Sequence, residues 1–222
     1  YNNFHIMANS GMSYKKALSY ALQGKVFIEN DIKERPISIA LVSHGYNIYD
    51  KRACMDISHK LEKMDVRVEC ATLGRIIDFE QNDPNDMGRV MAPSVIDTLT
   101  RHLEETGRDA SYYDLIVTGD LGIYGKEIVV DYLSKNYDIH LSNYNDCGII
   151  LYDLKTQKDV KAGGSGPVCS ALVVYSYLYA LLKKKKYKRI LVLATGALFS
   201  PIMVFQKQNI NSICHAISLE AV

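Results

Sequence analysis

A glycine-rich corner is the stretch of this sequence best suited to bind a small anion. It comprises Gly163, Gly164, Ser165 and Gly166, and it leads into an apolar run at residues 168–182 with the spacing of a buried helix. Glycine permits positive φ and lets a ligand approach the backbone. Amides at a helix N-terminus, together with the helix dipole, favour negative charge. The pattern is equally typical of a tight turn that packs a helix on a sheet, so both interpretations stay open.

A second corner, Gly119-Asp120-Leu121-Gly122, follows a short apolar stretch at residues 114–118. Asp120 has the chemistry of a general base, but an aspartate in this position more often caps the next helix, and we favour capping. Ligands of open α/β sheets bind at the carboxyl ends of the strands. We therefore expect the two corners to face one crevice.

Cys169 and His215 are the side chains from which a nucleophile and its base would be built. Cys169 lies near a helix start, where a thiolate is stabilised, but only the fold can bring His215 or His140 to it. The favoured interpretations are a small buried residue for Cys169 and a hydrogen-bonded core histidine for His215. The glycine corner lacks both the P-loop lysine and the dinucleotide fingerprint, so no known motif supports nucleotide binding, and we expect no cofactor. The five cysteines show no zinc spacing, and we expect no metal.

Composition narrows the class of protein. The chain has 222 residues and a net charge of +1, so no bulk basicity indicates nucleic acid binding. Five cysteines without paired spacing favour a reducing compartment, and no apolar run is long enough to span a bilayer. The chain opens with Tyr1-Asn2-Asn3, without methionine or a signal pattern, which favours a fragment or a processed piece.

The chain divides into three predicted parts. Residues 1–36 form a polar lead with a short helix at 14–23, residues 37–67 form a small β-loop-α-β unit, and residues 68–222 form an α/β domain. Within the unit, residues 43–50 resemble a loop of the domain that accompanies activators of 2-hydroxyacyl-CoA dehydratases.

The third part is predicted to have the order β-α-β-α-β-α-β-β, in a mixed five-stranded sheet. The last strand is expected to run antiparallel, at an edge or in a hairpin. The first helix is expected to open at Pro93 and close at Gly107. The predicted strands are residues 68–79 (with a turn), 114–118, 147–152, 190–194 and 213–219, and the other predicted helices are 124–135 and 168–182.

Residues 68–219 resemble the C-terminal half of the stage V sporulation protein AD family, thiolase-like proteins of spore-forming bacteria. The motifs that carry this resemblance are Asn85-Asp86-Met87-Gly88, Met91-Ala92-Pro93, residues 114–122, Asp146-Cys147-Gly148, residues 162–166, Ala194-Thr195-Gly196-Ala197-Leu198, Ser200-Pro201 and His215-Ala216. The resemblance implies a non-enzymatic protein that binds dipicolinic acid for uptake into the developing spore. It also implies a cytoplasmic location, peripheral to the spore inner membrane, beside other stage V sporulation proteins.

The resemblance also suggests the site residues. Thiolase superfamily enzymes place a histidine in the corner that holds Asp120, and an ionised aspartate cannot donate to a developing oxyanion. The expected ligand-binding residues are Gly119, Asp120, Leu121, Gly122, Gly163, Gly164, Ser165, Gly166, Thr195 and Gly196. The alternative is an acyl-CoA-handling acyltransferase that uses Cys169 with His215.

The sequence departs from the family in three places. Pro167-Val168 alters the glycine corner, the loop with residues 205–207 and 211–212 is less polar, and the N-terminal thiolase half is replaced by the 37–67 unit. We therefore expect a truncated or chimeric form.

The helix at 168–182 is apolar on nearly every face, so one sheet cannot cover it. We expect a homo-oligomer, most simply a two-fold dimer through this helix. The lysines at 183–186 complement the helix dipole; contact with an anionic membrane surface is the alternative.

Overall fold

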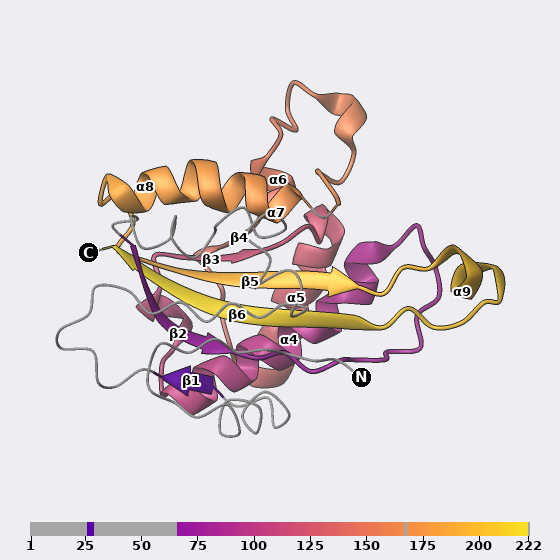
Figure 1. The fold of residues 1–222 in the computed structure, drawn as a ribbon, viewed down its shortest axis with the longest axis horizontal. Helices are drawn as coiled ribbons and strands as arrows, with labels where there is room; N and C mark the ends of the chain where they lie inside the picture. Colours follow the sequence, from indigo (N-terminus) through magenta and orange to yellow (C-terminus); the bar gives the residue numbers. More distant parts are fainter. Residues whose placement is uncertain (1–25, 29–65, 167, 222) are drawn as a thin grey trace, which may run out of the picture.

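A six-stranded mixed sheet forms the centre of the computed structural model, which describes residues 26–28, 66–166 and 168–221 (Figure 1). Its strands are β1 (Val26–Ile28), β2 (Val66–Thr72), β3 (Leu115–Thr118), β4 (Tyr144–Asp146), β5 (Arg189–Ala197) and β6 (Ser212–Ala221), in the order β1-β2-β6-β5-β3-β4. β5, β3 and β4 run parallel, whereas β6 runs antiparallel to both β5 and β2. From β2 onward, the predicted element order and mixed five-stranded sheet are confirmed.

The last strand was expected to run antiparallel, at an edge or in a hairpin. β6 does pair antiparallel with β5, the strand before it, but it does not lie at an edge, because β2 pairs with its other side. The sheet also has a strand that was not predicted: β1, in the lead, pairs with β2. β2 crosses the predicted boundary between residues 67 and 68 without interruption. The rest of the 37–67 unit and the helix at 14–23 lie outside the described residues, so a separate unit stays a prediction.

Helices cover both faces of the sheet (Figure 1). One face carries α4 (Met87–Thr106) and α5 (Gly122–Tyr137). The other carries a continuous helical rod made of α7 (Cys169–Leu172), a π-helical stretch η3 (Val173–Leu178) and α8 (Tyr179–Lys183). Strand alternation separates the two cores, because Leu191 and Leu193 of β5 face α4 while Ile190 and Val192 face the rod.

Helix α4 begins earlier than predicted. The Asp86 carboxylate caps it by accepting from Arg89 N at 3.2 Å, so Pro93 lies inside the helix rather than in its first turn. Gly107 ends the helix in the left-handed conformation, as expected. The other short helices of the described residues are η1 (Ala110–Tyr112), α6 (Cys147–Ile150), η2 (Lys158–Val160) and α9 (Pro201–Phe205).

The predicted strands at 68–79 and 147–152 needed correction. β2 ends at Thr72, and beyond it only Ile77 bridges to Ser212. In the second case the strand is β4, just upstream, and residues 147–150 form α6 instead. The cause is Asp146, whose carboxylate accepts from Gly148 N at 2.9 Å and so starts a helix where the apolar run alone favoured a strand.

Candidate functional site

The predicted site segments meet at one end of the sheet, and we call this meeting point the corner site. Asp120, just after β3, accepts from Gly166 N at 2.8 Å and from Ser165 Oγ at 3.1 Å. Thr195 Oγ1 of β5 lies 3.5 Å from the other Asp120 oxygen, which is a long contact. The structure therefore brings together the two glycine corners and Thr195, which precedes Gly196.

Asp120 has a different role from the one we favoured. It does not cap α5, because the amides of Leu121 and Gly122 at the start of that helix donate to Asp146 instead. Its carboxylate instead joins the two corners and serves as an internal anion for the glycine corner. This use of an acceptor oxygen agrees with the expectation that Asp120 is no oxyanion donor.

The glycine amides already have acceptors within the protein. Gly166 N donates to Asp120, and Gly164 N donates to Gly148 O at 2.8 Å. A ligand carboxylate that bonds either of these glycine amides must therefore displace its present acceptor. Of the two, the Asp120 side chain is the one that can move without breaking the backbone packing of the corner.

Asp146 organises the corner site and was missing from the predicted set. Its fully buried carboxylate accepts from Thr118 Oγ1 (2.7 Å), Leu121 N (2.9 Å), Gly122 N (3.0 Å) and Gly148 N (2.9 Å). Burial raises the pKa of Asp146, and these four hydrogen bonds oppose that rise. The sequence signal was an aspartate directly before the pair Cys147-Gly148, which is an N-cap pattern.

Two glycines show how closely the loops pack. Gly122 has φ of +70°, and a Cβ there would lie 2.8 Å from Ala162 O, beside the hydrogen bond from Ile123 N to that same oxygen. A Cβ at Gly164 would lie 2.8 Å from Cε2 of Tyr152. A larger residue at Gly164 would thus displace the Tyr152 ring as well as any ligand.

Cys169 is not arranged as a nucleophile. It is buried, its Sγ lies 3.9 Å from Gly119 O, and burial, with help from Asp120 and Asp146, raises its pKa to about 11. His215 accepts a hydrogen bond from Gly74 N at 3.0 Å, and burial lowers its pKa. Among the described hydrogen bonds, none joins Cys169 to a histidine, so the thiol stays protonated at neutral pH.

A second concave feature, which we call the rod groove, lies beside the helical rod. It has a volume of about 570 Å³ and is lined by Leu115, Asn145, Ile150, Leu151, Leu172, Val173, Ser176, Tyr177, Leu178 and Tyr187. None of the predicted ligand-binding residues lines it. No sequence motif marks it, because its residues come from five separate elements, β3, β4, α6, α7 and η3, and from the loops at Leu151 and Tyr187.

The described residues hold neither a cluster of metal ligands nor a helix that could span a membrane. No group of three or more His, Cys, Asp or Glu side chains there is placed to hold a metal ion. No helix of the described residues combines the length and apolar character needed to cross a bilayer.

Comparisons with known proteins place the chain in a family. The family model described as Stage V sporulation protein AD matches residues 53–220. Stage V sporulation protein AD of Bacillus subtilis (strain 168) is 42% identical over 156 residues, which cover 70% of this chain and 46% of that protein. The chain therefore spans less than half the length of the curated relative that it matches.

Solved structures give partial likenesses. 3-Oxoacyl-[acyl-carrier-protein] synthase III from Aquifex aeolicus VF5 is 13% identical, with a TM-score of 0.38 over 67% of this chain and 43% of that one. Human mitochondrial 3-ketoacyl-CoA thiolase is 14% identical, with a TM-score of 0.34 over 75% of this chain and 33% of that one. The assignment rests on the sequence matches: the chain belongs to the stage V sporulation protein AD family.

Proposed function

We propose that this chain is a non-enzymatic sporulation protein that binds dipicolinic acid for uptake into the developing spore. In this proposal it works peripherally at the spore inner membrane, beside other stage V sporulation proteins. Family membership supports the sporulation role. The observation that carries the ligand is that the glycine corner already holds a carboxylate, that of Asp120, through Gly166 N and Ser165 Oγ.

Binding is an exchange of carboxylates. Dipicolinate is a small planar dianion at neutral pH, and one of its carboxylates takes the two donors that Asp120 now occupies. Asp120 is only partly buried, so its side chain can turn toward solvent. Gly163, Gly164, Gly119 and Gly122 keep the backbones close, and the entering group meets no bulky side chain from them.

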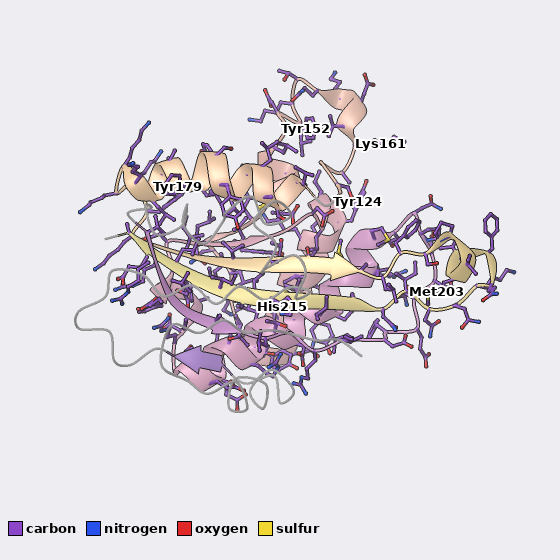
Figure 2. The ribbon with its side chains drawn as sticks, viewed as in Figure 1. Tyr124, Tyr152, Lys161, Tyr179, Met203 and His215 are labelled. Carbon is purple, nitrogen blue, oxygen red and sulfur yellow. The ribbon has the colours of Figure 1, made fainter. Side chains whose placement is uncertain are left out.

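Aromatic and cationic side chains flank the same corner. Figure 2 shows Tyr124, Tyr152 and Lys161 where the 147–166 segment stands out from the sheet. A hydrogen bond from Ile123 N to Ala162 O joins the residue before Tyr124 to the residue after Lys161. The Tyr152 ring lies against Gly164. Tyrosine faces favour a planar ring, and a lysine favours the second carboxylate.

The Asp120→Asn variant tests this exchange by calorimetry with dipicolinate. The wild-type protein must leave a displaced carboxylate beside the bound dianion, whereas the amide carries no charge and is a weaker competitor. We expect Kd to fall about tenfold, equivalent to about 1.4 kcal/mol. Asp159→Asn, an exposed change on the same segment, should leave Kd unchanged. Equal or weaker binding in Asp120→Asn would contradict the exchange.

A further inference from the structure

Six large apolar side chains are exposed together at one end of the molecule, and we call them the apolar tip. They are Ile76, Phe79, Leu198, Phe199, Ile202 and Phe205. Backbone hydrogen bonds between Ile77 and Ser212 and from Ile210 N to Gln81 O hold the two contributing segments side by side. Figure 1 shows α9 projecting from the sheet at this end, and the side chain of Phe205 is 88% exposed. The tip is therefore a convex apolar knob.

The rim of the apolar tip is acidic. Asp78, Glu80 and Asp83 are all exposed. The cations nearby in sequence are Lys207 of the α9 segment and Arg75, which pairs with Asp97 at 2.9 Å. Asp78 accepts from Glu80 N and Asn209 Nδ2, and Asp83 accepts from Asn85. These donors are uncharged amide groups, so they do not neutralise either carboxylate. An acidic rim disfavours an anionic lipid surface and favours a cationic protein surface.

The rod groove has the complementary character. Its walls include Leu115, Ile150, Leu151 and the rings of Tyr177 and Tyr187. Beside Tyr187 stand the exposed lysines Lys184, Lys185, Lys186 and Lys188, with Asp114 as the neighbouring acid. Asn145 and Ser176 add polar groups to these walls. The groove is therefore a concave surface of mixed apolar and polar character, flanked by positive charge.

We propose that the apolar tip of one copy docks into the rod groove of a second copy. The knob matches the groove in shape, and its acidic rim matches the lysines in charge. Figure 1 places the end of α8 and α9 at opposite ends of the molecule, so two antiparallel copies would make this contact twice. A reciprocal contact closes a two-fold dimer, and it would also cover Leu172 and Tyr177, which the rod exposes.

Sedimentation equilibrium of the full 222-residue chain tests the contact. The wild-type protein should be a dimer at tens of micromolar, and Phe205→Asp should raise the dimer Kd more than tenfold. Lys184→Glu with Lys186→Glu should raise it similarly. The matched controls are Tyr137→Asp for the aromatic and Lys155→Glu with Lys158→Glu for the charges, and both should leave Kd unchanged. All of these side chains are exposed, and circular dichroism verifies that each variant folds.

Reversing the charges on both surfaces tests whether the acidic rim of the apolar tip contacts the lysines beside the rod groove. Glu80→Lys with Asp83→Lys should restore dimerisation in the Lys184→Glu, Lys186→Glu background. A monomeric wild-type protein, a dimer that neither set of changes weakens, or a failed restoration would each overturn the proposal. A monomer that instead pellets with vesicles of anionic lipid would identify the tip as a membrane contact, and this result would overturn it too.

Discussion

Replacing Asp146 with asparagine should destabilise the fold and loosen the corner site together. The amide keeps one acceptor oxygen, so its NH₂ group must face either Gly122 N and Gly148 N or Thr118 Oγ1 and Leu121 N. Two hydrogen bonds to a charged acceptor are lost, each worth about 1.5–3 kcal/mol. The amide also removes a buried charge, whose cost is visible in the raised pKa of Asp146. The net loss in the free energy of unfolding is about 3 kcal/mol.

Urea denaturation followed by circular dichroism measures this loss. The midpoint should fall with an unchanged slope, and Tm should fall by about 6–12 °C. The matched control is Asp131→Asn, an exposed aspartate of α5 that pairs with Lys135, and it should change stability by less than about 0.5 kcal/mol. A loss below about 1 kcal/mol in Asp146→Asn would refute the view that this carboxylate holds the corner together.

Two further predictions concern pH and thiol chemistry. Buried His102, bonded to Thr72 Oγ1 (2.7 Å) and Tyr113 OH (2.6 Å), has its pKa lowered to about 4 by burial and then by Arg108. As pH falls, the unfolded chain protonates this histidine before the folded chain does, so the free energy of unfolding should decrease between about pH 6.5 and about pH 4, by about 3 kcal/mol in total. Denaturation measured over this pH range should show that decrease in the wild-type protein and a smaller one in His102→Gln. The chain should neither hydrolyse nor condense acyl-CoA thioesters; turnover that disappears in Cys169→Ala would restore the acyltransferase alternative.

Much of the fold could be predicted because its signals are local. The apolar runs at 114–118, 190–194 and 213–219 have the length of buried strands, and each became one. Gly107 ended α4 because only a residue that tolerates positive φ fits there. These patterns depend on neighbours in sequence, so they need no knowledge of the tertiary contacts.

The misplaced elements depended on tertiary contacts or on competing caps. Residues 147–152 are apolar enough for a strand, but the Asp146 carboxylate starts a helix there while also binding the amides of Leu121 and Gly122. Pro93 was expected at a helix start, and the stronger Asp86 cap moved that start upstream. The position of β6 inside the sheet follows from its pairing with β2, which local sequence cannot specify.

The candidate site was partly predictable from the topology of the sheet. Parallel strands bring their carboxyl ends to one edge, so the meeting of the two glycine corners followed from topology. The role of Asp120 did not, because a cap and a bridge to Gly166 have the same local sequence. The rod groove has no sequence motif, because its lining residues are scattered between positions 115 and 187 and only the folded chain brings them together.

Titration of the ¹⁵N-labelled chain with dipicolinate, followed by amide chemical shifts, tests the central proposal most directly. The exchange of carboxylates predicts that the largest shifts fall on Ser165 and Gly166, with Asp120 and Thr195 next. The same titration of Asp120→Asn should saturate at lower ligand concentration. Shifts centred on Ser176 and other residues of the rod groove, or no shifts at millimolar dipicolinate, would contradict the corner site as the place where this chain binds its ligand.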